Sequence, residues 1–347
     1  MKKLKWVKKM SKTIVGFILV DAPHSALNNA GTDAGERTDN IVKVKSIWKG
    51  KKLYPYVSGQ ALRYWWRDTL EQKFGWKMSP ITRETKIAFT EANPIEYDDD
   101  DVFGYMRAAK IKENKEKTDG KAVTRISPLK NSPLISIIGH FPEKDYGVMA
   151  RHEGNPVPYE HEFYATILKG IFSIDLDNLG VFYGVEKTGY KNMYPMLEEI
   201  AEEQGLSHEE KNKKWTMPDD IRIKRAHDVI KALPYLQGGA KLTSHLTDVS
   251  PKFIVLAAID GGNHIFMNIA KEENGEAIID FEALKEVIND YSESLLTKVY
   301  IGRRKGFMDE LDQDIAKLTQ ENENIKSGTI KEAVDQLADE IPELIKS

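Results

Sequence analysis

The sequence contains no cysteine in its 347 residues. This absence excludes disulfides, a thiolate nucleophile, and any zinc or iron–sulfur site with cysteine ligands. Long apolar runs are also absent, because the longest one, TIVGFILV at 13–20, is too short to span a bilayer. Asp21, Pro23 and His24 follow this run without a small-residue cleavage site, so we interpret it as a first strand rather than a signal peptide. We therefore expect a cytoplasmic protein with no membrane segment.

The signatures of common enzymes are missing as well. The sequence has no Walker loop, no GxSxG and no GxGxxG motif, and its eight histidines never form HExxH or HxH. His227 and Asp228 form a bare pair, which a metal-dependent phosphohydrolase would have to supplement with further ligands. The acidic run 97–101 (YDDDD) could hold a divalent cation, but consecutive carboxylates point in different directions and such runs are usually solvated. We expect no metal, no cofactor and no catalytic activity.

Charge is distributed unevenly along the chain, although the net charge is only −4. Residues 271–347 carry ten basic and nineteen acidic side chains, whereas residues 1–75 carry fifteen basic and six acidic ones. Aromatic residues are interleaved in the basic region, at Trp6, Trp48, Tyr54, Tyr56, Tyr64, Trp65 and Trp66. A basic, aromatic-rich region is typical of proteins that bind a polyanion, while an ordinary charged surface explains the composition equally well.

Hydrophobic periodicity and turn residues predict an α+β chain. Strands are expected at 13–20, 162–176, 252–259 and 263–270, the last two joined as a hairpin through Asp260-Gly261-Gly262. Helices are expected at 58–74 with Ser58 as N-cap, near 219–233, near 281–296 and after 308. Two polar or charged stretches, 80–160 and 184–220, are interpreted as insertions, the first without a large core of its own.

The predicted helix 58–74 has two different faces. Its apolar stripe consists of Ala61, Leu62, Trp65, Trp66 and Leu70. Gln60, Arg63 and Arg67 fall together on the opposite side, where an amide and two guanidinium groups one turn apart suit a phosphate backbone. The alternative is a solvated face on which Arg67 pairs with Glu71.

A fifteen-residue polar loop, 26–40 (ALNNAGTDAGERTDN), follows the first strand. A loop that is this long and polar is usually either functional or disordered. Gly31 and Gly35 would let backbone N–H groups approach an anion, and Asn28 and Asn29 can bond to phosphate or ribose without selecting a base.

Taken in order, the motifs resemble those of the backbone, or Cas-seven, subunit of type I CRISPR Cascade complexes, in particular its DevR branch and subtype I-B. The resemblance covers most of the chain. It rests on the segments 26–32 (ALNNAGT), 56–63 (YVSGQALR), 101–106 (DVFGYM), 125–129 (RISPL), 238–241 (GGAK) with 243–248 (TSHLTD), and 302–307 (GRRKGF).

The fold that this resemblance implies is a modified RRM-like (ferredoxin-like) palm of the RAMP superfamily with two insertions. The palm would comprise 1–82 and 161–310, the fingers 83–160 and the thumb 184–220, with acidic helices at 311–347.

The function that it implies is a non-catalytic CRISPR RNA-binding subunit in antiviral defence. Copies would polymerise head to tail along one guide, contact other Cascade subunits, and present the guide to complementary target DNA. The RNA-binding residues would be Asn28, Asn29, Lys43, Lys45, Ser58, Gln60, Arg63, Arg67, Arg107, Lys130, Lys241, Arg303, Arg304 and Lys305. A subunit repeated along an arbitrary spacer must read shape and charge and leave sequence to base pairing.

Two alternatives stay open at the level of sequence. Related backbone subunits of type III complexes cleave target RNA with a divalent metal and an acidic loop residue, for which Asp33 would be the candidate. The chain could also be a protein-only assembly or regulatory subunit, which would neither carry RNA nor respond to charge reversal at Arg63 and Arg67.

Overall fold

A large mixed sheet forms the centre of the computed structural model, which describes residues 11–31, 41–108, 121–151 and 153–347. Its main path, within these residues, runs in the order β22 (Ile325–Gly328), β21 (Val299–Arg303), β18 (Phe253–Asp260), β1 (Lys12–Ser25), β13 (Val157–Asp175), β11 (Leu134–Ser136), β5 (Lys52–Val57) and β4 (Ser46–Lys49). The strands that branch from this path are β10 (Leu129–Asn131), β12 (Glu143–Met149) and β3 (Ile41–Val44), which pair with β13, and β2 (Asn29–Gly31), which pairs with β3.

Strand β1 lies in the middle of the sheet, antiparallel to β13 on one side and to β18 on the other. Ile14 and Ile18 contribute to the core on one face, and Val15 and Phe17 to the core on the other. A strand that is buried on both faces is expected to read as a continuous apolar run, which explains TIVGFILV at 13–20. The prediction of a first strand is confirmed, and the strand continues to Ser25.

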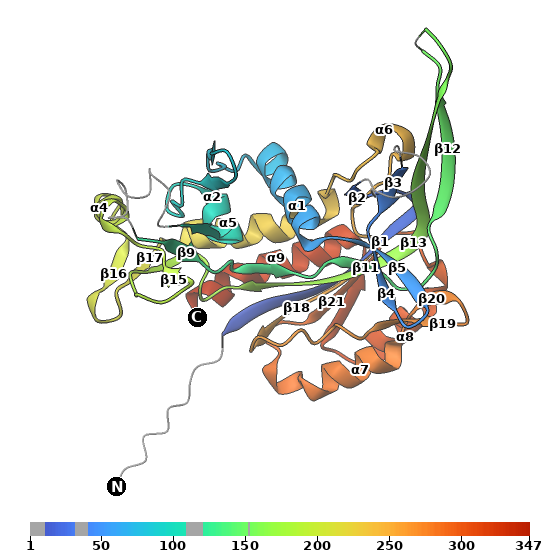
Figure 1. Cartoon of the computed structure of the whole chain (residues 1–347). Coiled ribbons are helices and arrows are strands. Elements are labelled where there is room, and N and C mark those ends of the chain that lie inside the picture. The colour runs from blue at the N-terminus through green and yellow to red at the C-terminus, as the bar shows by residue number, and fades with distance from the viewer. Residues whose placement is uncertain (1–10, 32–40, 109–120, 152) are drawn as a thin grey trace.

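Helices cover both faces of the sheet (Figure 1). The first face carries α1 (Gly59–Phe74), α5 (Asp219–Lys231) and α9 (Ile330–Lys346). The second carries α7 (Phe281–Asp290), α8 (Asp312–Glu321) and the segment around Phe266. The predicted helices at 58–74, near 219–233 and after 308 are confirmed, while the one near 281–296 is shorter than expected and ends at Asp290.

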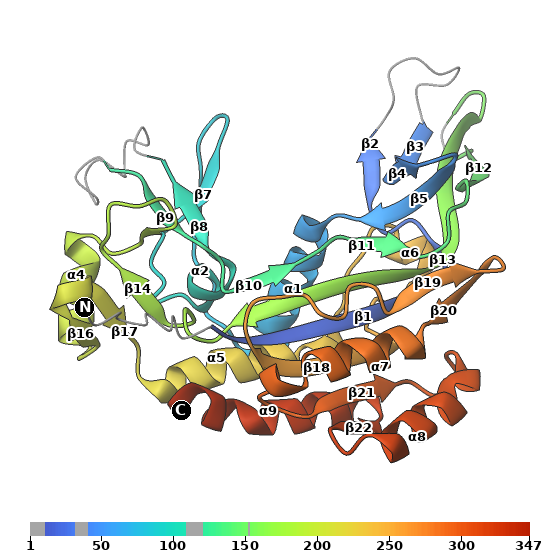
Figure 2. The ribbon, with the colours of Figure 1, turned by 90° about the horizontal axis from the view of Figure 1, so that it is seen from below.

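A smaller lobe with its own apolar core lies at one end of the sheet (Figure 2). Its core contains Ala92, Ile95 and Val123 together with Phe182 and Trp215. Parts of both predicted insertions therefore pack together in this lobe. Its elements are β6 (Ile81–Arg83), β7 (Ala88–Thr90), α2 (Asp98–Phe103), β8 (Tyr105–Arg107), β9 (Val123–Arg125), β14 (Val181–Tyr183), β15 (Tyr190–Lys191), α4 (Pro195–Glu203), β16 (Ser207–Glu209) and β17 (Lys214–Thr216). The boundaries of palm, fingers and thumb stay predictions.

The rest of the predicted insertion 80–160 lies elsewhere. Strand β12 pairs with the first half of β13 to make a long hairpin at the opposite end of the sheet from the small lobe (Figures 1 and 2). Tyr146, Val148 and Met149 are exposed on this hairpin.

Two sequence predictions were wrong. The acidic run is not solvated, because Asp99, Asp100 and Asp101 are buried in α2 against arginines of other elements. The segment 263–270 is not the hairpin partner of β18, because both edges of β18 are occupied by β1 and β21. Instead β19 (Ala270–Glu273) pairs with β20 (Glu276–Ile279). Among the described residues, no helix is long and apolar enough to cross a membrane.

Candidate nucleic-acid interface

The N-terminus of α1 lies against the loop that follows β1. Ser58 is the N-cap, as predicted, and its hydroxyl accepts the backbone N–H of Ala61. The backbone N–H of Ser58 donates to Oδ1 of Asn28 at 2.9 Å, and the N–H of Lys45 donates to the carbonyl of Asn28 at 2.9 Å. Asn28 therefore fixes the start of α1 beside the strands that carry the predicted lysines.

This helix terminus is favourable for an anion. The first N–H groups of a helix have no intrahelical acceptors and form the positive end of its dipole. The first turn of α1 contains no acidic residue, and Gln60 in this turn is exposed. A phosphate group placed here would meet backbone N–H groups and the Gln60 amide, a common arrangement for anion binding.

A second loop, 237–248, packs onto the same region. The N–H of Ala240 donates to the carbonyl of Leu27 at 3.1 Å. Gly238 has φ +149°, and a Cβ at this position would lie 2.2 Å from Cδ1 of Trp65 on α1. The close approach that glycine permits brings Lys241 and the short helix α6 (Leu242–His245) to the loop after β1.

The structure thus gathers one group of the predicted RNA-binding residues around the loop after β1 and the start of α1. This group consists of Asn28, Asn29, Lys43, Lys45, Ser58, Gln60 and Lys241. Residues 32–40 of the predicted loop, which include Asp33 and Gly35, lie outside the described residues.

Three histidines lie beside this group, and sequence reasoning did not assign them to one cluster. The ring of His245 on α6 is 6.1 Å from that of His24 and 5.7 Å from that of His161, measured between centroids. Nδ1 of His245 lies 3.0 Å from the carbonyl oxygen of His24. Burial lowers the pKa of His245, and the neighbouring imidazoles and Lys241 lower it further. The positions on three separate elements explain why no local motif revealed the cluster.

Arg63 is used inside the protein rather than presented to solvent. Its guanidinium donates to the carbonyls of Phe103 and Leu129 at 2.6 and 2.8 Å, to Ser127 Oγ at 3.0 Å and to Asn131 Oδ1 at 3.3 Å. Burial, with a smaller effect of Arg67, lowers its pKa to about 10. In this conformation Arg63 ties α1 to α2 and β10, and its contact with phosphate stays a prediction.

Arg67 also faces α2. Its Nε lies 3.6 Å from Oδ2 of Asp99, and its guanidinium lies over the ring of Phe103, 4.3 Å from the centroid. Burial raises the pKa of Asp99 to about 6, although the N–H of Ser79 and the charge of Arg67 oppose that effect. The alternative pairing of Arg67 with Glu71 is not observed among the described ion pairs. The helical wheel located this polar face correctly, but its two arginines pack against α2, whereas Gln60 is exposed.

The remaining predicted RNA-binding residues are either bonded within the protein or exposed to solvent. Arg107 is buried and donates to the carbonyl of Glu91, and Arg303 pairs with Asp309 and Asp312 and donates to the carbonyl of Phe307. Both guanidinium groups, like that of Arg63, donate to acceptors within the protein, and their contact with RNA stays a prediction. Three predicted residues are exposed, namely Lys130, Arg304 and Lys305. No group of three or more potential metal ligands is present in the described parts of the chain.

Comparisons with known proteins concern the fold and the family of the chain. Two solved structures, a "CRISPR RNA-guided surveillance complex, pre-nicking" and a "CRISPR RNA-guided surveillance complex", contain chains of similar fold. The first is 12% identical with a TM-score of 0.54 and covers 95% of this chain and 100% of the other. The second is 11% identical with a TM-score of 0.50, covering 94% and 98%. Identities this low support the likeness of fold alone, and no curated protein matches.

A family sequence model matches residues 20–274, a range that includes the end of β1, all of α1 and the loop 237–248. This range exceeds half of the chain, and it confirms the resemblance that the motifs indicated. The chain belongs to the CRISPR-associated family described as negative auto-regulator DevR/Csa2.

Proposed function

We propose that this chain is a non-catalytic backbone subunit of a type I CRISPR Cascade complex that binds the CRISPR RNA. Copies would line up head to tail along the guide and leave its bases available for complementary target DNA. Membership of the CRISPR-associated family and the likeness in fold to chains of surveillance complexes support a Cascade-type role.

Strand order supports the RRM-like palm. Four central strands lie in the order β18-β1-β13-β11, and each pairs antiparallel with its neighbours. Along the chain, α1 lies between β1 and β11, and α5 between β13 and β18, with both helices packed on one face. This β-α-β-β-α-β order is that of ferredoxin-like folds, to which the RRM belongs.

The observation that carries the proposal is the contact between Asn28 and Ser58, with Lys45 and Lys241 beside it. Amides, lysines and a helix N-terminus lie together in this region. Contacts of this kind bind phosphate and ribose whatever the sequence, which a subunit repeated along a variable guide requires.

The test is binding of two RNAs of equal length and unrelated spacer sequence, measured by fluorescence anisotropy over a series of salt concentrations. The proposal predicts similar affinities and a steep salt dependence, since each phosphate contact contributes about 0.7 to the log–log slope on a single strand. Absence of RNA binding, in the presence of the other Cascade subunits, would favour a regulatory protein, in line with the description of the family as a negative auto-regulator. Metal-dependent cleavage of target RNA that is lost in Asp33→Ala would favour the ribonuclease alternative.

A further inference from the structure

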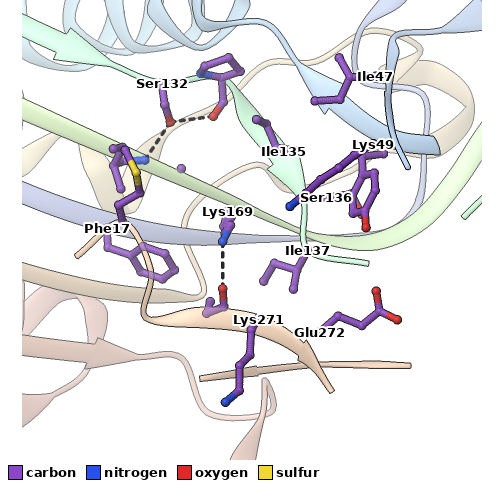
Figure 3. Close-up of a pocket in the computed structure, with 16 residues that line it drawn as sticks. Phe17, Ile47, Lys49, Ser132, Ile135, Ser136, Ile137, Lys169, Lys271 and Glu272 are labelled. Atoms are coloured by element: carbon purple, nitrogen blue, oxygen red, sulfur yellow. Dashed lines mark hydrogen bonds between the residues drawn. The ribbon is translucent and has the colours of Figure 1, made fainter. Parts of the chain in front are cut away.

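An apolar groove of about 460 Å³ opens on the second face of the sheet, opposite α1 (Figure 3). Ile135 and Ile137 beside β13 form part of its floor. The β4–β5 hairpin, with Ile47 and Tyr54, lines one part, and Met267 contributes from the segment before β19. Its volume is within the range of ligand and docking sites in proteins, roughly 300–1,000 Å³.

The two serine hydroxyls in this groove are already bonded within the protein. Ser132 Oγ donates to the carbonyl of Pro133 and accepts the N–H of Ile171. Ser136 Oγ bonds to the carbonyl of Ile138 and to Thr166 Oγ1. A nucleobase buried here would leave its polar edge without partners, at a cost of about 1–3 kcal/mol for each group.

Lysines border the apolar surface, and two of them have no carboxylate partner among the described residues. Lys169 Nζ donates to the carbonyl of Ala270 at 2.9 Å, and burial together with the charge of Lys49 lowers its pKa. Glu272, the single acidic residue of the lining, pairs with Lys52 at 2.7 Å. Lys271 pairs with Asp280 at 2.6 Å. Lys49 and Lys169 are therefore left as neighbouring cations beside apolar walls.

The walls also expose apolar side chains that a monomer would ordinarily cover. Ile47 is 40% exposed and Met267 is 50% exposed. Exposed apolar surface around a concave site, bordered by charge, is typical of protein interaction surfaces.

We infer that this groove is the docking site for a segment of a different protein subunit, with an apolar side chain on the groove floor and a carboxylate against Lys49 and Lys169. The inference rests on the proposed function, which supplies the complex in which such a subunit occurs. Charge complementarity selects an acidic partner segment, and the apolar floor with its internally bonded serine hydroxyls argues against RNA. Because the groove and the candidate nucleic-acid interface lie on opposite faces of the sheet, the two sites can be occupied together.

The test uses the full chain, tagged and co-expressed with the other protein subunits of its complex and with CRISPR RNA. The variant Ile47→Asp/Lys49→Glu places negative charge at two surface positions of the groove, where little effect on folding is expected. Its matched control, Lys51→Glu/Ile87→Asp, alters an exposed lysine of the adjacent turn and an exposed isoleucine of the small lobe. Native mass spectrometry then counts RNA, copies of this chain and each other subunit.

The expected result is that the groove variant keeps its RNA and loses at least tenfold in the occupancy of one other protein subunit, while the control keeps all subunits. Retention of every subunit would overturn the inference, and so would loss of RNA or of further copies of this chain as the primary effect. A wild-type complex without RNA would contradict the proposed function instead, and the subunit occupancies would still test the groove.

Discussion

Oδ1 of Asn28 accepts the backbone N–H of Ser58 at 2.9 Å, and this bond joins the loop after β1 to the first residue before α1. It connects two motifs that are thirty residues apart in the sequence. Both motifs belong to the candidate nucleic-acid interface, so a change in this bond should affect stability and RNA binding together.

Asn28→Ala removes the acceptor and leaves the half-buried N–H of Ser58 without this partner. We expect the free energy of unfolding to fall by about 1 kcal/mol. We also expect weaker binding of RNAs of any sequence, because the helix terminus would be less well fixed. Denaturant unfolding and anisotropy with two unrelated RNAs measure the two effects. Asn212→Ala, whose amide contacts only Glu209 in the small lobe, is the matched control and should leave RNA binding unchanged.

Arg63 should contribute mainly to stability, and Lys241 mainly to RNA binding. Arg63→Ala removes the guanidinium that donates to the carbonyls of Phe103 and Leu129, to Ser127 and to Asn131, so we expect a loss of about 2–4 kcal/mol in stability. Lys241→Ala should change stability little but lower the log–log salt slope of RNA binding by about 0.7. If Arg63→Ala is as stable as the wild type and its RNA binding has a reduced salt slope, Arg63 contacts phosphate, as the sequence alone predicted, and the structural role is refuted.

Asp99 should make stability depend on pH. Its pKa is raised by burial to about 6 from an ordinary value of 3.8, so between these values the folded state binds more protons than the unfolded chain. The contribution of Asp99 to the free energy of unfolding therefore falls as pH rises from about 4 to 6, by at most about 1.4 kcal/mol per pH unit. Asp99→Asn should remove this dependence. Asp314→Asn, at an exposed position on α8, should keep it, and equal pH profiles of the wild type and Asp99→Asn would refute the assignment.

Asp101 should be the most sensitive residue of the acidic run. It is fully buried, pairs with Arg125 and Arg225, and accepts the N–H of Gly180. Removal of this charge takes the carboxylate partner from the buried Arg125 and leaves Arg225 with Asp98, so Asp101→Asn should lower stability by about 3–5 kcal/mol. Thermal unfolding checks this, with the exposed Asp220→Asn on α5 as control. A loss below about 1 kcal/mol would show that the network is not essential to the small lobe.

Gly238→Ala tests whether the loop 237–248 belongs to the interface. The added Cβ would collide with Trp65 and displace the loop that carries Lys241. RNA affinity should fall several-fold, whereas Gly262→Ala, which meets no atom within 4 Å, should have no effect on binding. Unchanged affinity in a folded Gly238→Ala variant would remove this loop from the interface.

Local signals in the sequence predicted the elements that depend on local interactions. Ser58 before an apolar stripe predicted the start of α1, and the β-branched run predicted β1, because capping and periodicity act within a few residues. The family resemblance came from motifs in a fixed order. Sequence alone therefore predicted the α+β class, the main helices and one group of residues that lie together at the candidate interface.

Long-range partners account for what the sequence could not predict. The acceptors of Arg63 lie 40 and 66 residues away, and the arginines that bury the acidic run come from other elements. The Asp260-Gly261-Gly262 turn was expected to form a hairpin, yet β1 and β21 already fill both edges of β18. In each case the deciding neighbour is known only from the tertiary structure.

The most direct test of RNA binding is the nucleic-acid content of the purified protein across size-exclusion fractions, before and after ribonuclease treatment at high salt. The account predicts large particles with a high ratio of absorbance at 260 to 280 nm, which shrink and lose nucleic acid on treatment. A nucleic-acid-free protein that also fails to take up CRISPR RNA when the other Cascade subunits are present would contradict it.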